Sequence, residues 1–120
     1  MPYRMIGATG DALAAFFTDD VVQEEFPNRL VPAGARRDLA AILEGAVRGQ
    51  SVLTGQRFDI QSETADGDRV VLEVVWAGTL AIPIGSVAPG GDLRARFAVF
   101  LDFRDGRIAA QRNYDCFDPF

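Results

Sequence analysis

Few residue types in this chain could do chemistry. The 120 residues include no histidine and no lysine, and cysteine occurs once, at Cys116. Ser-His-Asp and Cys-His catalysis and Schiff-base chemistry are therefore excluded, and the composition argues against a zinc site or another metal site. Cys116 has no His or Lys to activate it, which favours inert packing. A carboxylate is the leading candidate for any general base, and no cofactor is expected.

Polar side chains converge on one face of the last predicted hairpin, whose strands are joined by Asp105-Gly106. If these two residues alone form the loop, Arg96 lies opposite Asp115 and Phe100 lies opposite Gln111. One face then carries the side chains of Arg96, Gln111, Asn113 and Asp115. A face with this many polar groups is hard to bury without a function.

Two interpretations of these polar residues stay open. Arg96 could polarise a substrate oxygen while Asp115 holds it in place, or the two could form an ion pair at the rim of the sheet. Asn113 and Gln111 could orient a carbonyl or hydroxyl group, or bind water in a pocket.

The elements that must position these residues follow from the sequence pattern. Asp11 is a plausible N-cap for a helix over residues 12–17, and a second helix is predicted over Asp38 to Arg48. Strands are predicted at residues 21–26, 53–63, 69–79, 93–103 and 107–117. Helices gathered on one face of a curved antiparallel sheet make a single α+β domain over residues 1–120.

Composition and charge exclude several classes of protein. The chain has 48% hydrophobic residues and a formal net charge of −5, as expected for one globular domain. It has no apolar run of about 18 residues and no Lys/Arg cluster, so neither a membrane span nor nucleic-acid binding is predicted. A single cysteine and an N-terminus without a signal-peptide pattern point to the cytoplasm.

The order of elements carries four landmarks: Phe16-Phe17-Thr18-Asp19-Asp20-Val21-Val22, Trp76-Ala77-Gly78-Thr79, Asp105-Gly106-Arg107-Ile108 and Asn113-Tyr114-Asp115. Together they resemble the superfamily of nuclear transport factor 2, ketosteroid isomerase and the SnoaL-like polyketide cyclases, over nearly the whole chain. The resemblance implies a conical α+β barrel with helices on the concave face of its sheet and a shortened first helix. It also implies a deep apolar pocket and a homodimer.

Some catalytic positions of the family carry a matching residue in this chain, and others do not. Glu25 falls on the proton-shuttling carboxylate of the isomerases, although it could instead pair with Arg96 or another arginine. The family's protonated acid falls on residues 98–99, where this chain has no acid, and its oxyanion tyrosine falls near Tyr3 with a shorter spacing. Arg96 and Asn113 lie about where the epoxide-hydrolase relatives have an Arg and an acid.

A predicted pocket face follows from the resemblance and agrees with the polar face of the hairpin. It comprises Gln23, Glu25, Leu72, Val74, Trp76, Arg96, Phe100, Gln111, Asn113 and Asp115. Trp76, Phe100 and Phe16 could stack on a flat polycyclic ligand, or they could be ordinary core residues.

These residues favour a cofactor-independent enzyme that abstracts a proton next to a carbonyl group of an apolar, oxygenated small molecule. Glu25 would be the base, and Arg96, Asn113 or a water would stabilise the oxyanion. The alternatives are epoxide opening by a water that Glu25 and Asn113 position, a non-catalytic binding module for a hydrophobic metabolite, and a dimerising domain. The helices can cover only one apolar face of the sheet, so the other face is predicted to form the homodimer interface.

Overall fold

Alternating apolar residues form long strands in the second half of the chain, as the sequence predicts. The computed structural model describes residues 8–120. The four strands are β3 (Leu53–Asp66), β4 (Arg69–Leu80), β5 (Asp92–Arg104) and β6 (Arg107–Phe117). Asp105 and Gly106 join β5 to β6 with φ angles of 52° and 77°, the pair of positive values that a type I′ turn requires. The predicted tight turn is therefore confirmed.

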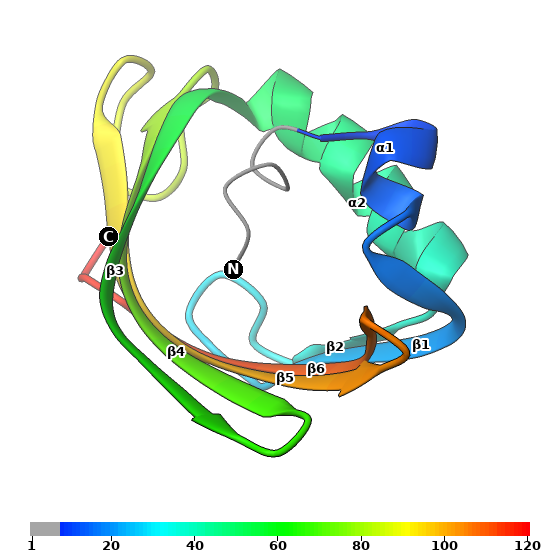
Figure 1. The fold of residues 1–120 in the computed structure, drawn as a ribbon. Helices are drawn as coiled ribbons and strands as arrows, with labels where there is room; N and C mark the ends of the chain where they lie inside the picture. Colours follow the sequence, from blue (N-terminus) through cyan, green and yellow to red (C-terminus); the bar gives the residue numbers. More distant parts are fainter. Residues whose placement is uncertain (1–7) are drawn as a thin grey trace.

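Two strands from the first half of the chain complete the sheet. β1 (Phe17–Glu25) and β2 (Ala35–Arg37) extend it in the order β2-β1-β6-β5-β4-β3. The pairing of β1 with β6 is parallel, so the sheet is mixed where the sequence predicts antiparallel strands throughout. β2 lies in a stretch for which the sequence predicts no strand. The sheet curls into an open C in Figure 1.

Two helices lie across the open side of the C (Figure 1). α2 (Leu39–Val52) begins after Asp38, whose carboxylate accepts a hydrogen bond from the backbone N–H of Ala41 at 2.9 Å. α1 (Gly10–Ala14) is short, and the chain turns directly from it into β1 at Phe17. The predicted α+β fold, with a curved sheet and helices on its concave face, is confirmed.

The apolar interior has two clusters of buried side chains. One lies between the helices and the sheet and contains Leu13, Phe17, Val21, Ile42, Leu72, Val74, Val99, Leu101 and Ile108. The other lies toward the far end of β4 and β5 and contains Trp76, Leu80, Leu93 and Ala95. Each fully buried side chain of this size stabilises the fold by about 1.5–3 kcal/mol.

A β-bulge in β6 decides which side chains reach the concave face. Phe103 pairs with Ile108, but Asp102 pairs with Ala110, so Ala109 is an extra residue on β6. An extra residue shifts all later pairs by one position and exchanges the faces of one strand relative to the other.

The predicted pairs of the hairpin are therefore wrong beyond the turn. Arg96 pairs with Cys116 in place of Asp115, and Asp115 pairs with Phe97. Because opposed residues share a face, the polar residues of β6 lie on the face of Phe97 and Val99, and Arg96 lies on the other face.

No helix within residues 8–120 has the length and apolar character that crossing a membrane requires.

Candidate functional site

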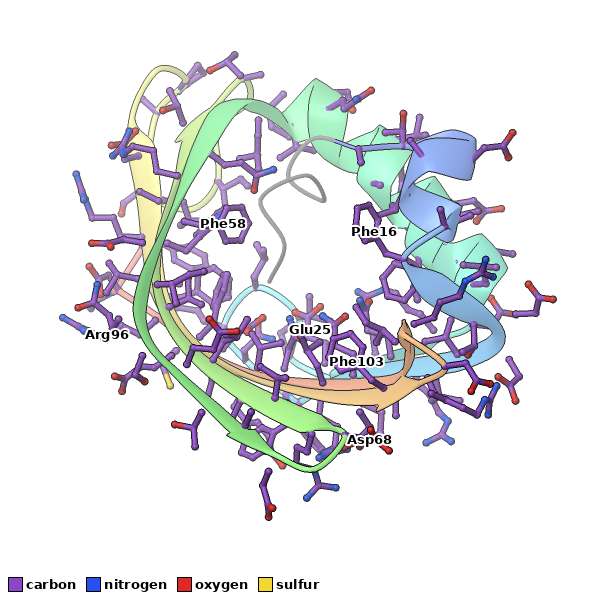
Figure 2. The ribbon with its side chains drawn as sticks, viewed as in Figure 1. Phe16, Glu25, Phe58, Asp68, Arg96 and Phe103 are labelled. Atoms are coloured by element: carbon purple, nitrogen blue, oxygen red, sulfur yellow. The ribbon has the colours of Figure 1, made fainter. Side chains whose placement is uncertain are left out.

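Parallel pairing of β1 and β6 brings polar side chains together on the concave face of the sheet. Glu25 lies beside Asn113, and Gln23 lies beside Gln111. Asp115 follows two residues after Asn113 and therefore points to the same side. Figure 2 shows Glu25 pointing into the interior of the curved sheet.

A cavity of about 510 Å³ opens at this point. Glu25, Asn113 and Asp115 line one side of it. Its other walls are mostly apolar and come from residues including Phe58, Val74, Trp76, Leu80, Leu93, Phe97, Val99 and Phe117. A volume of this size lies within the range of small-molecule pockets, which combine apolar walls with a few polar groups.

Glu25 has partners that complement its negative charge. Its Oε1 atom lies 3.1 Å from Nη2 of Arg37, and its Oε2 accepts a hydrogen bond from Nδ2 of Asn28 at 2.8 Å. The side chains of Arg37 and Glu25 are only 25% and 15% exposed, so little solvent screens the ion pair. These contacts fix the position of the carboxylate at the cavity wall.

Asp115, unlike Glu25, lies in surroundings that disfavour its negative charge. Burial, and next the negative charge of Glu25, raise the pKa of Asp115 from 3.8 to about 7, while Arg37 lowers it. Its Oδ1 atom is buried and has no hydrogen-bond partner within residues 8–120. Asp115 is therefore largely protonated below neutral pH.

Trp76 forms a flat wall of the cavity and is held in place from two sides. Its Nε1–H donates to Oε1 of Gln56 at 3.1 Å, and its ring stacks on Phe97 with centroids 5.5 Å apart. Gly78 leaves room for the ring, because a Cβ atom at that position would lie 2.6 Å from it. Trp76 is therefore held in one orientation at the cavity wall, and with 7% of its surface exposed it is also part of the core.

Comparison with known proteins identifies the family. The sequence model of the SnoaL-like domain matches residues 6–111. The chain belongs to the SnoaL-like family. No curated protein matches this SnoaL-like chain.

Solved structures share its fold. The chain is similar to IdmH, a proposed polyketide cyclase from Streptomyces antibioticus, with a TM-score of 0.71 and 24% identity over 88% of this chain and 78% of IdmH. A ketosteroid isomerase-like protein from Catenulispora acidiphila, solved with trimethylamine, has a TM-score of 0.69 and 20% identity, with 95% and 85% of the two chains covered. AclR, a proposed hydroxylase from Streptomyces galilaeus, has a TM-score of 0.69 and 17% identity over 87% of this chain, which spans 65% of AclR. The resemblance noted in the sequence is confirmed.

Two predicted site residues of this SnoaL-like chain lie outside the pocket. Arg96 is exposed and points away from the interior (Figure 2). Phe100 shares the outer face, where its ring packs edge-on against Tyr114 with centroids 5.6 Å apart, and the guanidinium of Arg112 covers it. The cause is the bulge at Ala109, which places Asp115 on the inner face without bringing Arg96 there. The homodimer interface on the outer face stays a prediction.

The remaining predicted pocket residues divide between the cavity and its surroundings. Val74 and Trp76 line the 510 Å³ cavity, while Gln23 and Gln111 line a second cavity next to the helices. Leu72 is completely buried in the core between the helices and the sheet. Phe16 packs against the same core and points inward in Figure 2. Tyr3 lies outside the described residues.

Several residues of the site cannot be predicted from local sequence patterns. Arg37, the partner of Glu25, lies in the three-residue strand β2, which is too short to leave a periodic signal. Phe97 and Phe117 line the cavity but are not among the predicted pocket residues. A signal for the bulge exists, since Ile108 and Phe117 are apolar and nine residues apart, and regular alternation cannot bury both on one face.

Within residues 8–120, no group of three or more Cys, Asp or Glu side chains could hold a metal ion.

Proposed function

We propose that this SnoaL-like protein is a cofactor-independent enzyme that moves a proton at a carbon next to a carbonyl group of an apolar small molecule. The observation that carries the proposal is the pairing of two differently partnered carboxyl groups in one apolar cavity. Glu25 is held by Arg37 and Asn28, and Asp115 has a buried oxygen that finds no partner among residues 8–120. Environments that separate two carboxyl groups in this way typically assign the roles of base and acid.

Glu25 would act as the base. Its carboxylate would take the proton from the carbon, and the electron pair of that C–H bond would form the enolate. Arg37 would hold the carboxylate in place at the cavity wall. The proton would then return to another carbon, or the enolate carbon would attack a second carbonyl group, which gives isomerisation or ring closure.

Asp115 would supply the oxyanion donor that the sequence resemblance leaves empty at residues 98–99. Its protonated carboxyl group would donate a hydrogen bond to the carbonyl oxygen as negative charge develops there. Asn113, which lies between Glu25 and Asp115 along the cavity wall, could donate a second bond through its amide. Because the pKa of Asp115 is raised to about 7, the rate should fall as the pH rises above neutrality.

The epoxide-opening alternative keeps Glu25 and Asn113, which line one cavity, but Arg96, which lies where the epoxide-hydrolase relatives have an arginine, faces away from that cavity. The non-catalytic binding alternative keeps one supporting observation: both oxygens of Glu25 already have protein partners. A carboxylate engaged in this way could serve architecture alone.

Proton exchange tests the proposal and separates it from the binding alternative. The probe is 2-acetylnaphthalene in D₂O, and the NMR signal of its acetyl protons reports their replacement by deuterium. The native protein should accelerate exchange above buffer, and Glu25→Gln and Asp115→Leu, which removes the donor, should each reduce the acceleration by about 10²-fold or more. Asp59→Asn, an exposed change on β3, is the control and should have no effect.

A probe that binds without exchanging its protons in any variant would support the binding module. Full exchange activity in Glu25→Gln would remove Glu25 as the base.

A further inference from the structure

A second cavity, of about 690 Å³, lies between the helices and the β1–β6 part of the sheet. The two cavities share Arg48, Gly49, Leu53, Gln56 and Phe58 in their walls, so they are neighbours in the interior of the curved sheet. Phe58 points into that interior in Figure 2. We call the 510 Å³ cavity the inner-acid chamber, because it contains Asp115, and the 690 Å³ cavity the helix chamber.

The helix chamber contains a polar group without a partner. Gln111 lines it and is only 4% exposed. Its Nε2 donates to Oδ1 of Asn113 at 2.9 Å, and its Oε1 has no hydrogen-bond partner in the part of the chain that the structure describes. Such buried unpaired groups are rare in folded proteins and call for a specific explanation.

The amide leaves one polar atom unpaired whichever way it is oriented. If both amides were turned over, Asn113 would donate to Gln111, and the NH₂ group of Gln111 would become the unpaired one. A hydroxyl group satisfies either arrangement, because it can donate to an oxygen and accept from an NH₂ group. The site therefore fits a ligand hydroxyl better than a carbonyl or an amine.

Asp115 and Gln111, the polar residues of the two chambers, lie on the same strand, β6. Gln111, Asn113 and Asp115 alternate along the concave face of β6, and four residues of extended strand cover about 13 Å. A ligand that contacts both Asp115 and Gln111 must therefore be elongated, with polar groups at opposite ends. Between them it would pass the apolar walls around Phe58 and Trp76.

We propose that the helix chamber is a hydroxyl-binding subsite, and that Gln111 selects ligands carrying a hydroxyl group at the end remote from the carbonyl that Asp115 contacts. The assignment of the carbonyl end rests on the proposed function, whereas the hydroxyl subsite rests on Gln111 and its chamber. Gln111 would be a specificity-determining residue and not a catalytic one, since it contacts the end of the ligand that does not react.

The test compares two ketones that differ only in the remote hydroxyl group, 2-acetylnaphthalene and 6-acetyl-2-naphthol. Trp76 is the one tryptophan of the chain and lines the inner-acid chamber, so quenching of its emission reports binding. N-acetyltryptophanamide titrated in parallel corrects for absorption by the probes. At pH 6 we expect 6-acetyl-2-naphthol to bind the native protein about tenfold more tightly, equal to about 1.4 kcal/mol.

Gln111→Met keeps the length of the side chain and removes its amide. This variant should bind both ketones with equal affinity, because the hydroxyl group of 6-acetyl-2-naphthol then has no amide to bind. Ala46→Phe provides a second route, because Ala46 lines only the helix chamber and a phenyl ring there should obstruct the hydroxyl end. It should also reduce the ratio of the two affinities to about one, so the test survives if Gln111→Met fails to fold.

A native protein without preference for the hydroxyl compound would overturn the proposal, and so would a tenfold preference that persists in Gln111→Met. These outcomes need no turnover and are distinguishable from failure of the proposed function. A Gln111-dependent preference without proton exchange would leave the subsite standing and remove the enzyme.

Discussion

Replacing Asp115 by Asn should stabilise the protein at neutral and alkaline pH relative to the native chain. Asp115 binds its proton more tightly in the folded state than in the unfolded chain, where the pKa is near its ordinary value of 3.8. Between these two pKa values the folded state holds a proton that the unfolded state has lost. The free energy of unfolding of the native protein therefore falls as the pH rises from about 4 to 7.

The magnitude follows from the raised pKa of about 7. The full difference between 3.8 and 7 corresponds to about 4 kcal/mol, of which about 3 kcal/mol falls between pH 5 and pH 8. Solvent reaches part of the Asp115 side chain and weakens the effect, so we expect about half of the change between pH 5 and pH 8, or about 1.5 kcal/mol. Asn at this position does not titrate, and the variant should escape this loss.

Urea unfolding at pH 5, 6, 7 and 8 measures the effect. The stability of Asp115→Asn minus that of the native protein should grow by about 1.5 kcal/mol from pH 5 to pH 8. Asp59→Asn is the matched control, and its difference from the native protein should stay constant. A difference for Asp115→Asn that is also constant, or that shrinks as the pH rises, would show that the pKa of Asp115 is not raised in the folded protein.

Three further changes test other parts of the site. Glu25→Gln should lower the pKa of Asp115 by removing a like charge, so the loss of stability between pH 5 and pH 8 should shrink in the same urea series. Arg96→Ala should change stability by less than about 0.5 kcal/mol and leave the affinity for 2-acetylnaphthalene unchanged, since Arg96 is exposed on the outer face; a marked loss of affinity would contradict its placement. Gly78→Ala should destabilise the protein by about 1–3 kcal/mol and shift the emission of Trp76, because the added methyl group overlaps its ring; unchanged emission and stability would contradict this packing.

The overall fold was accessible from the sequence because its signals are local. The alternation in β3 to β6, the Asp105-Gly106 turn and the cap at Asp38 each follow from a few neighbouring residues. The short β2 and the parallel pairing of β1 with β6 depend on contacts distant in sequence, so local patterns did not reveal them.

The site was predicted only in part, and a single residue explains much of the difference. Regular pairing beyond the turn would place Arg96 opposite Asp115. The extra residue Ala109 shifts the pairs by one, so Arg96 and Asp115 lie on opposite faces of the sheet. The arginine that serves the site is Arg37, which β2 supplies from across β1. Glu25 and Asn113 were found because each strand keeps its own alternation, whatever its register with the next strand.

The central claim is that the cavity holds Asp115 protonated beside the ion pair of Glu25 and Arg37. A ¹³C NMR titration of the Asp115 carboxyl carbon, assigned by its loss in Asp115→Asn, tests this claim directly. We predict an inflection near pH 7 in the native protein and an inflection at lower pH in Glu25→Gln. An inflection near the ordinary value of 3.8 in the native protein would contradict the account.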